Sequence, residues 1–493
     1  MFVRFLLWTT IRWKIWFIFA AEMKWTELHI KKGIACVFLI SGMIILAKLS
    51  SCTFQMPREE LTPQQQNHIS RIFLADKIRQ FREVLHHSHQ RHHFNGNILV
   101  ARDGKIIFND FIGYADLDTK DTLTLHSVYQ LASLTKQFTA MAVIQLKERD
   151  SIDYDDQMVQ YIPEFKGDNH HYYDSITIRH LLNHTSGMSN YLYLIERYTE
   201  DNRKPYNDEV LDLLAKHKQY LSFEPGTRFQ YSNTGYIILA LIVERVSGKR
   251  FDEFIDDNIF SPLEMHHSFV YSSAYGNKNS NNRLKGYRRY GNNYWVPETQ
   301  HDGVVGDKGV CAPAIDLYKW DQALYSNKLV SQEALEDIFE RGKLENGRRI
   351  PYGFGFRLKK DAEGNKVAYH NGLWNGFRNG IYRYLNDTST IIILEHTDCK
   401  ARGIIQRKIR NILHSPHHNV TRILAEKAIN DGGEQASEVY ATMNKMNLEF
   451  SVRIDKLIEV QEYLREIDKH ILARNVRTLI KAVEKSGGIP DTG

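Results

Sequence analysis

Cysteine is scarce in this sequence, with four residues in a chain of 493. Four cysteines are too few for the disulfide framework that stabilises many small secreted domains. Cys36 and Cys52 fall in an N-terminal stretch with the composition of a targeting segment, so the folded part of the chain holds at most one disulfide. The apolar content of 42% and the charged content of 25% are those of a globular protein.

A strong excess of charge of either sign is also absent. The formal net charge is +5, and no stripe of lysine and arginine stands out along the chain. Nucleic-acid binding therefore has little support from the sequence. The length leaves room for one large catalytic domain with additional segments, or for about two to three ordinary domains.

The apolar run near the N-terminus is short. Residues 33–47 form fifteen positions without a charge, and two lysines precede them. A run of this length is short for a membrane-spanning helix, and with its basic flank it is typical of a signal peptide. The segment LSSC, which ends at Cys52, then resembles the lipobox of bacterial lipoproteins, and this implies a lipid on Cys52. We interpret residues 1–52 as a targeting segment, with an uncleaved membrane anchor as the alternative. We expect the mature protein to be attached to the membrane on the extracytoplasmic, periplasmic side of the cell envelope.

Residues 53–68 are polar and include two prolines, which is typical of a linker. A helical periodicity of apolar residues follows over residues 69–85. Five histidines come next, between His86 and His93. Imidazole is a common metal ligand, but their spacing matches no metal-binding pattern, so we expect a solvated helix face and no metal site.

Ser133 is the one serine in the chain with a lysine, Lys136, three residues further on. Residues i and i+3 of a helix share a face, so the hydroxyl and the ε-amine can meet. Residues 138–146 leave almost no polar face and predict a buried helix that starts near Ser133. The helix N-terminus stabilises negative charge there, and burial lowers the pKa of Lys136, which makes it a base near pH 7. We predict Ser133 as the nucleophile and Lys136 as its base. The alternative is a chance spacing, with Ser133 as a helix N-cap.

A second motif, Tyr231-Ser232-Asn233, stands at the entry to an apolar helix over residues 237–246. A phenol beside an ammonium has a lowered pKa, so we expect Tyr231 to share a proton with Lys136 and deliver it to the leaving group. Asn233 can donate to a substrate carbonyl and accept from Lys136. The triplet recurs at Tyr325, where it ends an ordinary amphipathic helix, so the triplet alone does not identify a site.

Strands are indicated in two regions. Two apolar runs around Asp103-Gly104 predict a hairpin within residues 97–108. Later segments alternate apolar and polar residues as antiparallel strands do, over 354–359, 367–370, 377–385 and 390–396. The third motif, His370-Asn371-Gly372, falls at the end of the second of these strands. We expect Gly372 to let a substrate backbone lie along the strand, because a side chain would block it.

The motifs, in this order and at these separations, resemble the serine β-lactamase and penicillin-binding-protein superfamily, above all its class C-like branch. The segments NILVARDGKIIF, YQLASLTKQF, LLNHTSG and GVVGDKGVCAPAIDLYKW add to the resemblance, which covers residues 69–413. It implies an α+β fold of β-lactamase/transpeptidase type, in which an antiparallel sheet is flanked by helices and carries an all-helical subdomain. It also implies that His184 shapes the wall of the site instead of acting as a base, as a packed histidine often does.

The resemblance implies substrate-binding roles for His370, Asn371, Gly372 and Leu373. The N–H groups of Leu373 and Ser133 would form the oxyanion hole. His370 stands where the family carries Lys-Thr-Gly or His-x-Gly, and a histidine is mostly neutral at pH 7. Asn371, in place of threonine or serine, is a further departure. The neutral histidine and this asparagine favour a general peptidase or esterase over a true β-lactamase or transpeptidase. Asp307-Lys308 stands where small residues are more usual, and we expect it to alter access to the site. The departures at Asn371 and Asp307-Lys308 also motivate an alternative, a protein that keeps the fold and binds ligands without turnover.

Beyond this region, residues 414–493 contain amphipathic helical stretches over 436–443, 454–464 and 472–483. Paired helices of this kind resemble a degenerate tetratricopeptide-like appendage, with too few repeats to stand alone. We expect this tail to dock on the catalytic domain, on a second copy or on a protein partner.

The sequence thus predicts a serine hydrolase that forms an acyl-enzyme and needs no metal or cofactor. The expected substrates are D-amino-acid peptides, β-lactams or small esters. The alternative is a catalytically weak or inactive protein of the same fold that binds or senses ligands at the cell envelope.

Overall fold

The computed structural model describes residues 59–166, 171–200, 203–217, 220–274, 282–291, 293–297, 299–361, 364–414, 416–445 and 451–486. The predicted targeting segment 1–52, with Cys52, lies outside them. The chain divides into residues 1–65 and 66–493, and the fold described below is that of the second unit. In the described part of the chain, no helix is both long enough and apolar enough to cross a membrane.

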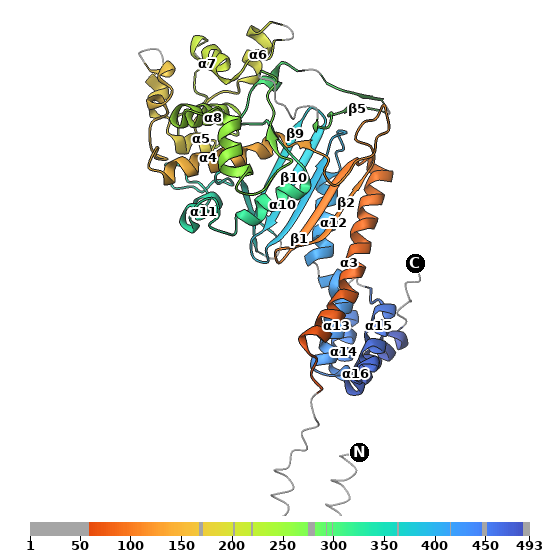
Figure 1. Ribbon diagram of the computed structural model, residues 1–493. Coiled ribbons are helices and arrows are strands. Elements are labelled where there is room, and N and C mark those ends of the chain that lie inside the picture. Colours follow the sequence, from red (N-terminus) through yellow and green to blue (C-terminus); the bar gives the residue numbers. More distant parts are fainter. Residues whose placement is uncertain are drawn as a thin grey trace, which may run out of the picture. The chain divides into compact units, whose positions relative to one another are not determined.

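Six antiparallel strands form the central sheet, in the order β2-β1-β11-β10-β9-β8 (Figure 1). Their bounds are β1 Gly96–Arg102, β2 Lys105–Ile112, β8 Arg357–Lys360, β9 Lys366–Trp374, β10 Phe377–Tyr384 and β11 Ser389–Glu395. Asp103 and Gly104 connect β1 to β2 with φ values of 50° and 65°, as a two-residue hairpin turn with positive φ requires. The predicted hairpin and the four later strands are confirmed, but β9 continues to Trp374 and contains the whole third motif.

Helices cover both faces of the sheet. Successive side chains of a strand point to opposite faces, so neighbouring residues of β1 belong to two different apolar clusters. Ile98 and Val100 pack with α3 (Pro63–His92) and α12 (Arg402–His414) in one apolar cluster. Leu99 and Ala101 pack on the other side, in a cluster with α4 (Thr135–Glu148), α8 (Thr234–Ser247) and α10 (Ala314–Ala323). The predicted α+β class is confirmed, and the sheet lies between two helical layers (Figure 1).

The helical subdomain lies between β2 and β8 in the chain and includes α4 and α8. Its other helices are α5 Ile178–Leu182, α6 Leu192–Tyr198, α7 Asn207–Lys216 and α9 Phe251–Ile255, and α11 Gln332–Phe339 follows α10. Short strands β3 (Tyr129–Gln130), β7 (Val310–Ala312) and β4 (Phe269–Val270) form a small sheet in that order, and β5 (Arg288–Tyr290) pairs with β6 (Asn293–Trp295). The small sheet joins the segment before Ser133 to the segment after Asp307, and this pairing brings two parts of the site together.

Helix boundaries differ from the sequence prediction in two places. Helix α3 begins at Pro63 and not at residue 69, so the end of the predicted linker is helical. After α12, the segment around Pro416 begins a further helix, α13 (Pro416–Asn430), where the sequence had indicated a break. Proline is tolerated at the first position of a helix, because its missing N–H has no partner there. The predicted tail helices are α14 Gly433–Lys445, α15 Ile454–Glu466 and α16 His470–Lys485.

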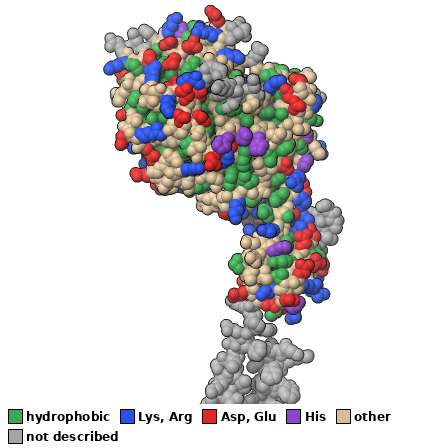
Figure 2. Space-filling view, in the orientation of Figure 1, with side chains coloured by type: hydrophobic (Ala, Val, Ile, Leu, Met, Phe, Trp, Pro, Cys, Tyr) green, Lys and Arg blue, Asp and Glu red, His purple; other side chains and the backbone are tan. Residues whose placement is uncertain are grey.

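Charges of both signs are interspersed on the face shown in Figure 2. The histidines that follow the predicted helix are exposed or half-buried at the end of α3. Within the described ranges no group of three or more histidine, cysteine or acidic side chains is arranged to hold a metal ion. Cys311 and Cys399 are buried free thiols and do not form the disulfide that the sequence allowed.

A buried ion pair between β10 and α10 should contribute strongly to stability. Arg383 Nε lies 2.5 Å from Asp321 Oδ1, both side chains are fully buried, and Thr390 donates to the same carboxylate oxygen. Arg383→Met would leave the buried carboxylate without its partner, so we expect a loss of about 3–5 kcal/mol in unfolding free energy. Urea denaturation would measure it. Lys249→Met is the control, because its pair with Asp257 is exposed and should be worth less than about 1 kcal/mol. Equal losses in the two variants would contradict the expectation.

Candidate active site

Ser133 lies in a tight turn that the sheet holds in place. Strand β3 leads into the 3₁₀ turn η1 (Ala132–Leu134), and α4 starts immediately afterwards. Ala132 has a φ of 53°, a conformation that costs an L-residue energy and is found mainly where the surroundings enforce it. Ser133 is half-buried and does not cap α4. The prediction that it stands at the start of a buried helix is confirmed, and the N-cap alternative is wrong.

Gly372 explains how this turn is held, and the reason differs from the predicted one. A Cβ at this position would stand 2.1 Å from the carbonyl oxygen of Leu131. The space that glycine leaves is therefore filled by the η1 turn, not by substrate. Gly372 lets β9 approach the backbone that carries Ser133.

Lys136 is fully buried, one helical turn after Ser133. Its Nζ donates to Ser133 Oγ at 3.2 Å, to Asn233 Oδ1 at 2.9 Å and to the carbonyl oxygen of Asp307 at 2.8 Å. Burial lowers the pKa of Lys136 to about 8, Asp307 acts to raise it, and Arg357 lowers it further. About a tenth of Lys136 is thus neutral at pH 7, and only this neutral form can act as a base for Ser133.

Tyr231 and Asn233 complete this group, and both come from the segment that enters α8. Asn233 occupies the N-cap position of α8 and is oriented by Lys136. The Lys136 Nζ lies over the Tyr231 ring, 5.0 Å from its centre. The expectation of a lowered Tyr231 pKa is wrong: burial raises it, and the smaller effects of Ser133 and Arg357 do not offset this. The Ser133 effect is that of a side-chain hydrogen bond, so the Tyr231 hydroxyl lies next to the Ser133 hydroxyl.

His184 packs against Tyr231. Its ring centre is 4.2 Å from that of Tyr231 and 4.6 Å from that of Tyr352. Its Nδ1 accepts from the Ser232 N–H at 3.2 Å, and burial holds the pKa of His184 well below its usual value. This neutral, packed ring forms part of the wall of the site.

The side chains of His370 and Asn371 point to opposite faces of β9, and the His370 ring lies 6.0 Å from the Tyr231 ring. His370 is 1% exposed; its Nδ1 lies 2.9 Å from the Asn371 carbonyl oxygen and its Nε2 lies 3.0 Å from the Tyr352 hydroxyl. Nδ1 must donate to the carbonyl, so Nε2 accepts from Tyr352. Asn371 points to the opposite face of the sheet, where its Oδ1 accepts from Tyr382. A direct substrate contact by the Asn371 side chain is therefore wrong, because alternation along β9 turns it away.

The edge of β9 has no partner strand among the described residues along most of the His370-Asn371-Gly372 motif and just beyond it. Strand β8 pairs with β9 only as far as Arg357 opposite Tyr369. Among the described strands, none covers residues 370–374 on that side. Leu373, the predicted oxyanion donor, lies in this open segment and is 57% exposed. Its role stays a prediction.

Arg357 belongs to the site and was missed in the sequence. Its guanidinium carbon lies 5.1 Å from the Tyr231 ring centre, and its charge lowers the pKa of Lys136, His184 and His370. The guanidinium makes no ion pair within the described part of the chain. As the first residue of a strand it carried no local signal, because only the pairing of β8 with β9 brings it to Tyr231.

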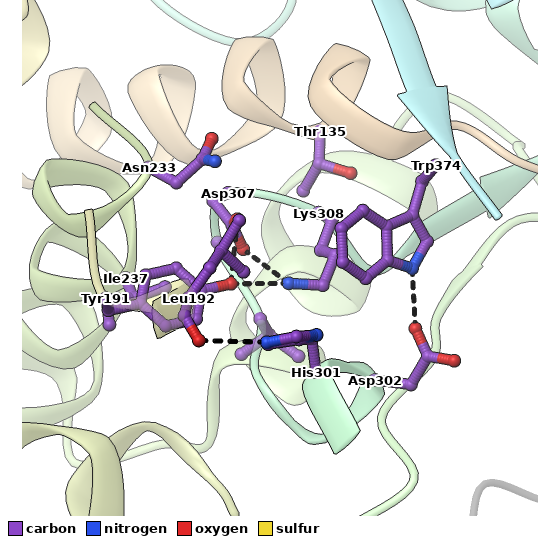
Figure 3. Close-up of polar contacts among 12 residues, drawn as sticks. Thr135, Tyr191, Leu192, Asn233, Ile237, His301, Asp302, Asp307, Lys308 and Trp374 are labelled. Carbon is purple, nitrogen blue, oxygen red and sulfur yellow. Dashed lines mark hydrogen bonds and ion pairs between the residues drawn. The ribbon is translucent and has the colours of Figure 1, made fainter. Parts of the chain in front are cut away.

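Asp307 and Lys308 contribute to the site in a way that the sequence did not predict (Figure 3). The sequence marked them as a departure that alters access to the site. Both are buried next to Lys136, and the Asp307 backbone orients the lysine directly.

Gly372→Ala should test the packing of β9 against η1. A methyl group would force the strand away from Leu131 and displace Ser133, so we expect at least a tenfold loss of reactivity at Ser133, since misplacement of about 1 Å can cost 10²-fold. Gly403→Ala is the control, because nothing lies within 4 Å of a Cβ there. Labelling rates of Ser133 with an active-site probe would measure both. An unchanged rate in Gly372→Ala would refute the packing role.

Comparison with known proteins agrees with this geometry. Residues 74–401 match the Beta-lactamase family. The "Penicillin-binding protein 4*" of Bacillus subtilis (strain 168) is 33% identical over 350 residues, which cover 69% of this chain and 76% of that protein. The octameric penicillin-binding protein homologue from Pyrococcus abyssi has a TM-score of 0.59 at 23% identity, over 70% of this chain and 80% of that one. The D-amino acid amidase from Ochrobactrum anthropi SV3 has a TM-score of 0.58 at 18% identity, over 69% of this chain and 98% of that one. The two structures show a shared fold, and the family match shows that this chain belongs to the Beta-lactamase family, in its class C-like form.

Proposed function

We propose that this protein is a serine hydrolase that works through an acyl-enzyme. The observation that carries the proposal is the contact of a buried Lys136 with Ser133 Oγ. Lys136 takes the Ser133 proton as Oγ attacks a carbonyl carbon. The resulting tetrahedral intermediate expels its leaving group, and water later cleaves the ester on Ser133.

We assign to Tyr231 the role of carrying a proton to the leaving group. It keeps its proton near neutral pH, so it can pass that proton to the leaving group and recover one from Lys136. Asn233 accepts from Lys136 through Oδ1, which leaves its NH₂ group to donate to the substrate.

A binding or sensing protein without turnover is the other candidate. Its motivation was the pair of departures at Asn371 and at Asp307-Lys308. Asn371 faces away from Ser133, and Asp307 supports Lys136, so neither departure removes a reacting group. The geometry therefore favours turnover. A sensor would release a stoichiometric burst of product and then stop.

For the substrate we propose small acyl compounds of the D-amino-acid peptide, β-lactam or ester type. Similarity to a D-amino acid amidase fold supports the first class. His370 is neutral and already bonded, so it offers no fixed charge to a substrate. Arg357 does, at the start of the open edge of β9, and this favours substrates with a carboxylate. We also propose that Cys52 carries a lipid, that the protein lies on the periplasmic side of the membrane, and that its helical tail binds a protein partner.

Labelling with a fluorophosphonate probe tests the nucleophile. The wild type should be labelled and Ser133→Ala should not, because only Ser133 contacts a buried amine base. Ser326→Ala is the matched control, since Ser326 stands in the second Tyr-Ser-Asn triplet, outside the site. Gel fluorescence would measure labelling. An unlabelled wild type, or equal labelling of Ser133→Ala, would refute the hydrolase.

Arg357→Met tests the substrate class. We expect a loss of roughly 10- to 100-fold in kcat/KM for a D-Ala-D-Ala peptide, as for a lost hydrogen bond to a charged group. Hydrolysis of p-nitrophenyl acetate, which has no carboxylate, should fall much less, through the effect of Arg357 on the Lys136 pKa alone. Arg357→Lys should retain part of the peptide activity. Arg349→Met removes an exposed arginine paired with Glu340 and serves as the control. Equal losses on both substrates would show that Arg357 is only structural.

A further inference from the structure

Asp307 and Lys308 form a buried ion pair (Figure 3). Asp307 and Lys308 are each 3% exposed, and Lys308 Nζ lies 3.4 Å from Asp307 Oδ1. The Tyr191 hydroxyl donates to Asp307 Oδ2 at 3.0 Å and accepts from Lys308 Nζ. The ring of Trp374, the last residue of β9, lies 4.6 Å from the ammonium. Each charge is thus held by several groups in a site without access to bulk water.

This pair is joined to Lys136 through one residue. The Asp307 carbonyl oxygen accepts from Lys136 Nζ at 2.8 Å, while its carboxylate is held by Tyr191 and Lys308. The turn around it fits tightly: Gly306 has a φ of 99°, and a Cβ there would stand 2.4 Å from the Tyr236 carbonyl oxygen. Loss of the contacts that Tyr191 and Lys308 make with the Asp307 carboxylate would therefore shift the Asp307 carbonyl oxygen, which accepts from Lys136.

The pair also sets the charge around Lys136. The Asp307 carboxylate acts to raise the pKa of Lys136. Lys308 carries the opposite charge beside that carboxylate and opposes this effect, and its own pKa is lowered in part by Lys136. Two buried charges cost several kcal/mol each in desolvation, so two small packed residues would serve stability as well or better. The pair is better explained by its effect on the site.

The groups with which Lys136 interacts come from several elements: Asp307, Lys308, Tyr231, Tyr236, His184, His370 and Arg357. The two histidines are held neutral by burial, and burial raises the pKa of both tyrosines. The charges that bear on Lys136 are therefore those of Asp307, Lys308 and Arg357.

We propose that Asp307 and Lys308 are positioning residues for Lys136, with the Asp307 carbonyl fixing its amine and the Lys308 ammonium balancing the Asp307 carboxylate. The proposal rests on the proposed role of Lys136 as the base. It assigns to two unusual residues of the rim a function in proton transfer that does not require contact with substrate.

The pH dependence of labelling at Ser133 tests this. In the wild type, the second-order rate with a fluorophosphonate should rise with pH and level off above about 8, the pKa of Lys136. Lys308→Met leaves the Asp307 charge unopposed, so its midpoint should move up by about one pH unit. Asp307→Asn removes the charge that favours the ammonium, so its midpoint should move down. The double variant should lie between them.

Lys319→Met is the matched control, because it removes the lysine of another aspartate–lysine pair, with Asp316 on α10. Its midpoint should equal that of the wild type. Thermal melting of each variant shows whether it is folded. Opposite shifts in the two single variants support the proposal, since a merely structural role would lower the rate without moving the midpoint. Shifts of the same sign, or none in folded variants, would overturn it. If the wild type is not labelled at any pH, the proposed hydrolase activity itself is refuted.

Discussion

The burial of the Lys136 ammonium is the constraint on which the site depends. An amine without water needs hydrogen-bond acceptors from the protein, because an unpaired buried charge is expensive. Ser133 Oγ, Asn233 Oδ1 and the Asp307 carbonyl supply them from three separate segments. The same burial lowers the pKa of Lys136 into the range where it can exchange a proton with serine. Packing and reactivity thus have one cause.

The sheet provides the rigid frame for this arrangement. Strand β9 lies against the turn that carries Ser133 through the space left by Gly372, and its far end carries Trp374 over Lys308. The strand edge beyond Tyr369 is left without a partner strand among the described residues. A site built on a strand edge and a helix start gains precision, because both elements are fixed by the core on each side of the sheet.

The buried rings around Tyr231 are neutral, so only a few side chains in the site carry a charge. His184 and His370 are both held uncharged by burial, although by sequence either one was a candidate for chemistry. The charges that remain are Lys136, Arg357 and the Asp307–Lys308 pair. In our proposals Arg357 recognises an anionic substrate, while the pair tunes the base.

The sequence by itself determined the features that depend on nearby residues. The Ser133–Lys136 spacing, the Asp103-Gly104 turn and the alternation of the later strands all act within a few positions, so they could be recognised from local patterns. Tertiary structure alone decided the rest. Asn371 turns away from the site because of its place in the alternation of β9, and Arg357 reaches Tyr231 only through strand pairing. From the sequence we expected a cation beside Tyr231 and a lowered pKa of its phenol. The structure places Lys136 over the Tyr231 ring in a buried site, and this burial raises the pKa of Tyr231. The burial of a side chain and the direction in which it points depend on contacts between segments that are distant in the sequence. Local sequence patterns therefore do not reveal them.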